Sequence, residues 1–208
     1  MREIFLRGAN PRVEDLQALY TDSPFSMAKA YPEVPPPDDS LSPMILAARW
    51  AAHDLYAEDM PGIAADLLEK GLDSPALKRV AAEMHLDSSE AAQPQVGRMF
   101  RELGILHRLG EDEAKLVVSR QVAREVIAGY RNAWSAASHL EIVVWSWVSP
   151  NPELGKIFSI NDELQWEARY RRSLSDLRCA LIAAFVRVAM MTIGDVDVVM
   201  PPKAEELD

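Results

Sequence analysis

The stretch that decides the fold is residues 161–194, NDELQWEARYRRSLSDLRCALIAAFVRVAMMTIG. Its apolar residues recur mostly three, four, six or seven positions apart, which is the spacing of one buried face of an α-helix. Asn161 suits the start of a helix, and Gly194 suits the left-handed turn that follows one. The pattern predicts one long amphipathic helix from Asn161 to Gly194 and an all-α protein. Its apolar face would consist of Leu164, Ala168, Leu174, Leu177, Leu181, Phe185 and Val188.

Helix signals recur through the rest of the chain. Asp73-Ser74-Pro75 combines a capping residue with a proline suited to the first turn, and therefore predicts a helix start. Glycines such as Gly104 predict helix ends. We expect a bundle of about eight helices packed around the long C-terminal helix. The other predicted helices are 13–20, 42–58, one around 63–68, 75–84, one from about 90 to 103, 111–127, 132–148 and a short one at 153–158.

The organisation predicted is a single helical domain over residues 1–208, with two lobes at about 1–106 and 107–208. The prolines between residues 32 and 37 predict a rigid, extended connector without helix. Short apolar stretches at 4–6 and 196–200 could form a minor β pairing between the two ends of the chain.

Composition restricts the classes of protein. The 32 acidic and 22 basic residues give a net charge of −10, which disfavours general nucleic-acid binding. The single cysteine, Cys179, cannot form an internal disulfide, and we expect it to be buried as a small apolar residue. The most apolar stretch, 179–193, is interrupted by Arg187 and is short for a bilayer. The sequence predicts a cytoplasmic protein without a membrane segment.

The segments 75–84 and 93–103, joined by a turn at 85–89, have roughly the size of a helix–turn–helix unit. The turn exceeds the usual length of about three or four residues, and Pro94 falls near the start of the second helix. DNA binding by a regulator is therefore an alternative hypothesis. Its candidate contacts to DNA are Arg98, Arg101 and Arg108.

No motif predicts a metal site or a known catalytic site. The four histidines show neither the His-x-x-x-His nor the Glu-x-x-His spacing of metal-binding helices. The Gly-x-Ser-x-Gly elbow, the P-loop and the dinucleotide-binding glycine pattern do not occur. We expect no cofactor, and an enzyme with an unrecognised site is a second alternative hypothesis.

Aromatic and basic residues near the C-terminal helix are candidates for an interaction surface. Trp145 and Trp147 are two positions apart on a predicted helix, so they project from different sides of it and one of them lies off the core-facing stripe. Exposed tryptophans often dominate binding energy at interfaces. The basic run around Arg171 could bind an acidic partner or a phosphate, or could be an ordinary solvated face. The candidate interaction residues are Trp145, Trp147, Trp166, Arg169 and Arg172.

The stretch GLDSPALKRVA at 71–81, with Glu102-Leu103-Gly104 further on, resembles a segment of small uncharacterised bacterial all-helical proteins. The resemblance covers about half the chain, and its motifs mark helix starts and ends. It implies a bacterial, cytoplasmic protein and carries no catalytic residue. Acidity, the missing motifs and the aromatic segment together favour a non-enzymatic interaction protein or an immunity-like accessory factor. Its partner would be another protein or a second copy of the chain, and nucleic acid is disfavoured.

Overall fold

The computed structural model describes residues 27–83, 88–105, 109–144, 151–165 and 174–192. These residues form eight α-helices and one 3-10 turn and contain no strand, which confirms the predicted all-α class. The elements are α2 (Pro43–Ala51), η1 (Ala57–Asp59), α3 (Met60–Glu69), α4 (Pro75–Ala82), α5 (Ser89–Glu102), α6 (Glu111–Ala128), α7 (Ala133–Val144), α8 (Pro152–Gln165) and α9 (Leu174–Met190).

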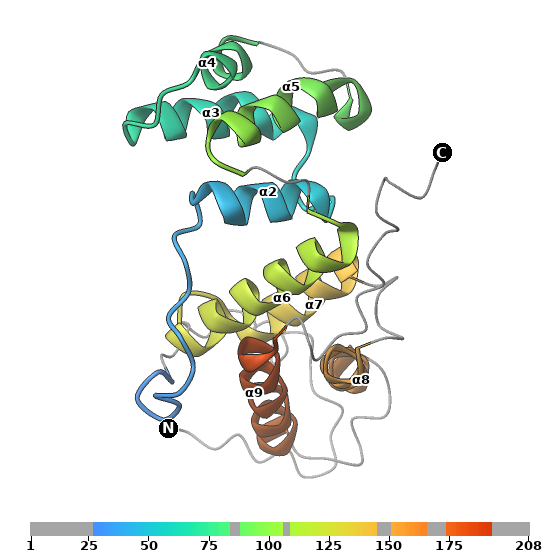
Figure 1. Ribbon diagram of the computed structural model, residues 1–208. Coiled ribbons are helices and arrows are strands. Elements are labelled where there is room, and N and C mark those ends of the chain that lie inside the picture. Colours follow the sequence, from blue (N-terminus) through green and yellow to red (C-terminus); the bar gives the residue numbers. More distant parts are fainter. Residues whose placement is uncertain (1–26, 84–87, 106–108, 145–150, 166–173, 193–208) are drawn as a thin grey trace, which may run out of the picture.

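The helices are arranged as an elongated stack (Figure 1). Helices α3, α4 and α5 form one end, helices α6 to α9 form the other, and α2 lies between them. Helix α2 packs on α6, and α9 packs on both α6 and α8. Buried side chains form one cluster that extends from Leu46 in α2 to Met191 after α9. The described residues therefore share one continuous core, in which α6 packs against α2 on one side and against α9 on the other.

Serine caps start three of the helices. The Oγ atoms of Ser42, Ser74 and Ser88 each accept a hydrogen bond from a backbone N–H three residues further on, at 3.1–3.3 Å. Such a bond satisfies one of the N–H groups that a helix start leaves without a partner. The predicted helix start at Ser74-Pro75 is confirmed, because Pro75 is the first residue of α4.

A glycine follows each of two helices, and the predicted helix end at Gly104 is confirmed. Gly104 follows α5 with φ +96°, and Gly129 follows α6 with φ +81°. Both angles lie in the left-handed region, which glycine enters at little cost because it has no Cβ. The end of α6 at Gly129 then places Tyr130 and Arg131 on a short bend before α7.

The predicted helix 42–58 is wrong at its C-terminal end. Helix α2 stops at Ala51, and His53 adopts φ +59°, which breaks the helical path. Arg49 Nε donates to Asp54 Oδ2 at 2.7 Å across this bend. The bend turns Asp54 toward α7, which becomes important for the pocket described below.

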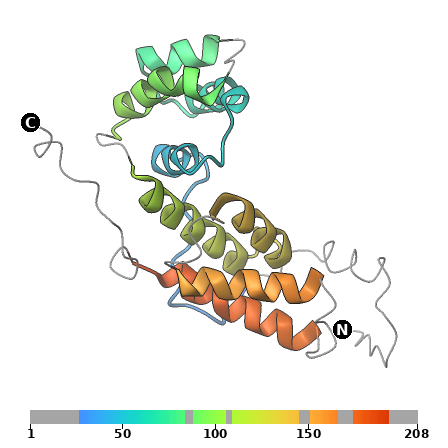
Figure 2. The same ribbon diagram turned by 90° about the vertical axis from the view of Figure 1, so that its right-hand side faces the viewer.

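The predicted continuous helix from Asn161 to Gly194 is also wrong. Helices α8 and α9 are two separate helices that pack side by side (Figure 2). Asn161 is a buried residue inside α8, where its side-chain amide donates to Glu141 Oε2 at 2.8 Å, and it caps nothing. The cap of α8 is Asn151, whose Oδ1 accepts from Leu154 N at 3.2 Å, just before Pro152.

Part of the predicted apolar face is correct. Leu177, Leu181, Phe185 and Val188 are buried in α9. Burying a side chain as large as Phe185 contributes about 2–3 kcal/mol to stability. Cys179 on the same helix is exposed, so the expectation that it is a buried residue is wrong. The reason is geometric, because Cys179 follows the buried Leu177 by two positions and so projects from another side of the helix.

Several expectations concern residues that the structure does not describe. They are the helix 13–20, the β pairing of 4–6 with 196–200, and the end of the helix 132–148 beyond Val144. The side chains of Leu164, Ala168 and Leu174, which belong to the predicted apolar face, are not described either. The division into two lobes at 1–106 and 107–208 stays a prediction.

Candidate functional site

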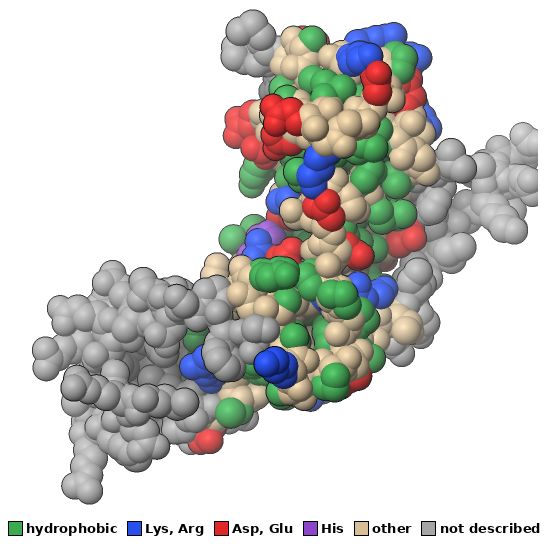
Figure 3. Space-filling view, turned by 90° about the vertical axis from the view of Figure 1, so that its left-hand side faces the viewer, with side chains coloured by type: hydrophobic (Ala, Val, Ile, Leu, Met, Phe, Trp, Pro, Cys, Tyr) green, Lys and Arg blue, Asp and Glu red, His purple; other side chains and the backbone are tan. Residues whose placement is uncertain are grey.

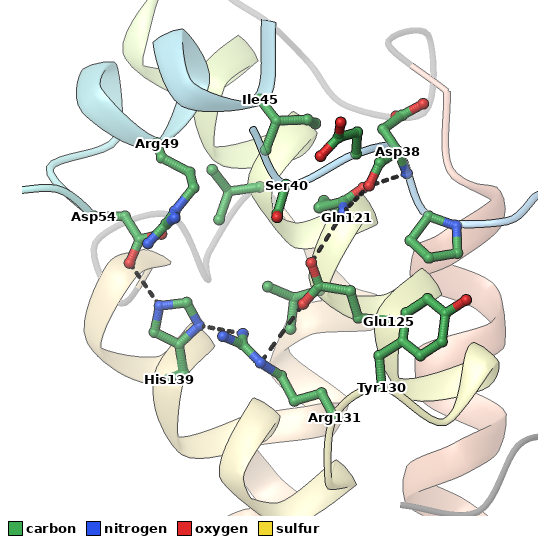
Figure 4. A pocket seen from close by; sticks show the side chains of 14 residues that line it. Asp38, Ser40, Ile45, Arg49, Asp54, Gln121, Glu125, Tyr130, Arg131 and His139 are labelled. Carbon is green, nitrogen blue, oxygen red and sulfur yellow. Dashed lines mark hydrogen bonds and ion pairs between the residues drawn. The ribbon is translucent and has the colours of Figure 1, made fainter. Parts of the chain in front are cut away.

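A polar pocket of about 550 Å³ lies where residues 37–40 meet helices α2, α6 and α7 (Figure 4). Four carboxylates and two guanidinium groups line it, so negative charge exceeds positive by two when its histidine is neutral. Figure 3 shows one face of the molecule, on which a histidine lies among acidic and basic side chains about midway along the stack. The lining residues are Pro37, Asp38, Asp39, Ser40, Ile45, Arg49, Asp54, Val118, Gln121, Val122, Glu125, Tyr130, Arg131 and His139.

The centre of the pocket is a carboxylate–imidazole pair. His139 Nε2 lies 2.6 Å from Asp54 Oδ1, and Arg49 Nε donates to the other carboxylate oxygen at 2.7 Å. The Asp54 side chain is only 7% exposed, so its charge is compensated mainly by these two partners and little by water. The pair joins the bend after α2 to helix α7.

The second ring nitrogen of His139 is occupied as well. Arg131 NH1 lies 2.8 Å from His139 Nδ1. A guanidinium group can only donate, so Nδ1 must accept this bond and Nε2–H must donate to Asp54. This assignment of the proton follows from the hydrogen-bonding pattern. His139 therefore accepts a hydrogen bond from the guanidinium group of Arg131 and donates one to the carboxylate of Asp54.

These contacts change the acidity of Asp54. Burial alone would raise the pKa of the Asp54 carboxyl, but the hydrogen bonds from His139 and Arg49 outweigh burial and lower the pKa below its ordinary value. Asp54 is thus ionised at neutral pH and serves as a fixed acceptor.

A second row of hydrogen bonds holds the wall of the pocket that residues 37–40 form. Gln121 Oε1 accepts from the backbone N–H of Asp38 at 3.0 Å, and Gln121 Nε2 donates to the Asp38 carbonyl at 2.9 Å. The same Nε2 also donates to Glu125 Oε1 at 2.9 Å, and Glu125 Oε2 lies 3.6 Å from Arg131 Nε. The polar side chains therefore form a connected row from Asp38 to His139 in α7 (Figure 4).

This arrangement favours binding over catalysis. A general base needs a nitrogen or oxygen free to accept a proton from the reacting group. Both nitrogens of His139 already have partners, so neither is left to activate the hydroxyl of Ser40. The pocket instead presents charged groups in fixed positions to whatever enters it.

Tyr130 provides an apolar surface at the same pocket. Its side chain is 76% exposed, although its backbone N–H donates to the Glu125 carbonyl at 2.8 Å. The ring is thus presented to solvent from an anchored backbone. A tyrosine in this situation is a common anchor for protein partners, because it offers a large contact area at small entropic cost.

The structure does not place the predicted interaction surface. Trp145, Trp147, Trp166, Arg169 and Arg172 all lie outside the described residues, so their role stays a prediction. Next to them in sequence, Ile142 of α7 is 80% exposed. Trp134, another aromatic residue of α7, is buried.

The predicted DNA contacts lie apart from the pocket. Arg98 and Arg101 are exposed on α5, and Arg108 is outside the described residues. Arg98 Nε donates to Glu102 Oε1 at 2.9 Å, while Glu102 Oε2 accepts from Ala76 N at the start of α4. Arg98 therefore takes part in joining α5 to α4.

Sequence reasoning missed the pocket residues. Asp54 and His139 are separated by 85 positions, and no sequence motif connects them. His53 and Asp54 fall inside the predicted helix 42–58, so the sequence pattern gives no hint of the bend at this point. The positive φ of His53 directs Asp54 toward α7. The spacing of apolar residues in the sequence does not reveal such a backbone angle.

Comparisons of the chain with protein-family models, with curated proteins and with solved structures found no match. In the described part of the chain, no three His, Cys, Asp or Glu side chains gather as they would around a metal ion. None of the described helices combines the length and the apolar character needed to cross a bilayer.

Proposed function

We propose that this protein is a non-enzymatic interaction protein, an accessory or immunity-like factor, that binds a partner protein at the polar pocket and Tyr130. The observation that carries the proposal is the hydrogen-bonded row of Asp54, His139 and Arg131, which occupies both nitrogens of the histidine. A cytoplasmic location, implied by the resemblance at residues 71–81, is part of this proposal.

The polar groups of the pocket are held in place before anything binds. Binding to such a site costs less conformational entropy than binding to mobile side chains, because the groups are already ordered. Asp38 and Asp39, at 59% and 60% exposed, lie in the lining and remain open to solvent. Lys70 Nζ pairs with Asp39 at 2.7 Å, and Arg124 NH1 lies 3.5 Å from Asp38, so cations beside the pocket already share these two carboxylates. A partner that presents hydrogen-bond donors, such as amide groups, therefore fits the lining better than one that only adds positive charge.

Two alternatives are weaker on the same observations. An enzyme that used His139 as its general base would need a free ring nitrogen, and both ring nitrogens are already bonded. A DNA-binding regulator would use Arg98, whose Nε is engaged by Glu102. Self-association remains a form of the proposal in which the partner is a second copy of the chain.

The experiment compares capture of partners from the native host's lysate by three forms of the full chain: wild type, Tyr130→Ala and Tyr56→Ala. Tyr56 is a matched control, because it is also a tyrosine between helices and is 64% exposed but lies outside the pocket lining. Captured proteins are quantified, the mass of the intact complex is measured, and nuclease is added to a parallel sample.

The proposal predicts one stoichiometric partner that is retained by wild type and Tyr56→Ala, is reduced at least about tenfold with Tyr130→Ala, and resists nuclease. Equal retention by both tyrosine variants would remove the pocket from the interaction. Loss only with nuclease would favour the DNA-binding alternative.

A further inference from the structure

Helix α6 carries a second group of charged side chains beside the pocket. Arg120 and Arg124 are one helical turn apart, so their side chains leave the same face of α6, with Cβ atoms about 5–6 Å apart. Gln121 and Glu125, which line the pocket, each follow an arginine by one residue, about 100° further round the helix. The arginine pair thus lies next to the pocket and not in it.

The Nε atom of each of these two guanidinium groups lacks an acceptor among the described residues. The Nε atoms of Arg120 and Arg124 are shielded from solvent and have no hydrogen-bond partner within the described part of the chain. Their one ionic contact given by the described residues joins Arg124 NH1 to Asp38 Oδ2, at 3.5 Å. The helix itself supplies no carboxylate three or four positions away. Those neighbours are Leu116, Val117, Gln121, Ala123, Ile127 and Ala128.

Asp38 compensates this charge only weakly. The Arg124 side chain is 12% exposed, whereas the Asp38 side chain is 59% exposed, so the carboxylate is largely in water and its attraction is screened. Burial and then the nearby Arg120 lower the pKa of Arg124, while Asp38 opposes them. The folded protein therefore keeps two like charges together, with donors that point to no acceptor.

We propose that Arg120 and Arg124 form a binding site for a doubly charged oxyanion, a phosphate group held between the two guanidinium forks. Guanidinium groups match the geometry of phosphate oxygens and donate paired hydrogen bonds to them. A phosphate would supply the missing negative charge and would accept hydrogen bonds from the outer nitrogens of both guanidinium groups. The group could be free phosphate or a small phosphate monoester, and this site is independent of the proposed partner interaction.

The experiment measures thermal unfolding of the full chain with inorganic phosphate, with phosphoserine and with chloride, all at matched ionic strength. Isothermal titration with inorganic phosphate gives the affinity directly. The variants are Arg120→Met/Arg124→Met, the milder Arg124→Lys, and the control Arg79→Met/Arg101→Met. The control removes the same charge from exposed positions on α4 and α5.

The site predicts that phosphate at about 20 times its Kd raises the Tm by on the order of 5 °C more than chloride does. This gain disappears in the α6 double variant, falls in Arg124→Lys and persists in the control. Without phosphate, the α6 double variant should unfold at the same or a higher temperature than wild type, because two neighbouring like charges that Asp38 compensates only weakly are gone. If both phosphoserine and inorganic phosphate stabilise the protein, the site binds phosphate groups in general. If inorganic phosphate alone stabilises it, the site binds the free anion.

Two outcomes overturn the inference. One is an equal effect of phosphate and chloride on wild type, which would leave only general ionic screening. The other is a loss of Tm in the α6 double variant without phosphate, combined with an unchanged response to phosphate, which would give the arginines a structural role.

Discussion

The side chains of Asp54 and His139, 85 positions apart in the chain, are joined by a hydrogen bond of 2.6 Å. The bond connects the bend after α2 to the middle of α7, and both residues line the pocket. Arg49 bonds the second carboxylate oxygen of Asp54, and Arg131 bonds the second ring nitrogen of His139. The positions of both arginines in the pocket therefore depend on the Asp54–His139 pair.

Replacing Asp54 by asparagine should destabilise the folded protein by about 1–3 kcal/mol, since the change leaves the partners of a buried carboxylate incompletely bound. The matched control is Asp73→Asn. Asp73 also forms an ion pair, with Lys78 at 2.7 Å, but both side chains are more than 60% exposed. Its replacement should cost less than about 0.5 kcal/mol. Urea denaturation of the three proteins measures both effects, and similar losses from the two variants would show that the buried pair is not special.

The stability that Asp54 contributes should depend on pH. The pKa of Asp54 is lower in the folded protein than its ordinary value of 3.8. Between these two values the unfolded chain binds a proton that the folded chain does not, so the free energy of unfolding falls as the pH falls. The contribution is therefore present above pH 3.8 and is lost as the pH drops through the lower, folded-state value.

The difference in unfolding free energy between wild type and Asp54→Asn should accordingly shrink as the pH is lowered from 6 to about 3. Urea denaturation at a series of pH values measures it. A difference that stays constant or grows over this range would contradict an ionised, hydrogen-bonded Asp54.

Helix caps can be ranked by their surroundings. Ser74 is 6% exposed and caps α4, whereas Ser88 is an exposed cap on α5. Replacing Ser74 by alanine should cost about 1–2 kcal/mol, and replacing Ser88 about 0.5–1 kcal/mol, because the backbone N–H near Ser88 can bond to water instead. Chemical denaturation of both variants checks the order, and a larger loss at Ser88 would reverse the explanation.

The thiol of Cys179 gives a direct check on the orientation of α9. Because Cys179 is exposed on this helix, the folded protein should react with one equivalent of a thiol reagent at a rate close to that of the unfolded chain. Cys179→Ser is the blank. Protection by more than about a hundredfold in the folded protein, as expected for a buried thiol, would place the residue in the core instead.

Local sequence signals predicted much of the helical architecture. Ser74-Pro75 marks the start of α4, and Gly104 marks the end of α5, because a cap or a left-handed turn depends on only a few neighbouring residues. The same rule applies at Asn151-Pro152, where it marks the start of α8. The predicted short helix at 153–158 begins there, but its end is wrong, because α8 continues to Gln165.

Periodicity misled the prediction where two helices shared one pattern. Residues from α8 and α9 both fit a helical repeat, and no glycine or proline lies between Asn161 and Gly194 to suggest a break. Because α8 packs side by side with α9, the two cannot be one continuous helix. Such packing depends on contacts across the whole chain and cannot be seen in a local pattern.

The candidate site could not be predicted from sequence, for a related reason. The bond between Asp54 and His139 depends on the path of the chain after α2 and on how α7 packs, and neither residue stands in a motif. Arg120 and Arg124 of α6 look like ordinary surface residues in the sequence. Only the position of Asp38 and the shielding of the two Nε atoms distinguish them.

Amide hydrogen exchange of the chain, alone and in the captured complex, tests the central claim most directly, because it locates the surface that the partner covers. The account predicts slower exchange on binding at residues 37–40, around Tyr130 and in the first turns of α7, with little change in α3, α4 and α5. Protection confined to α3, α4 and α5, with unchanged exchange around the pocket, would contradict it.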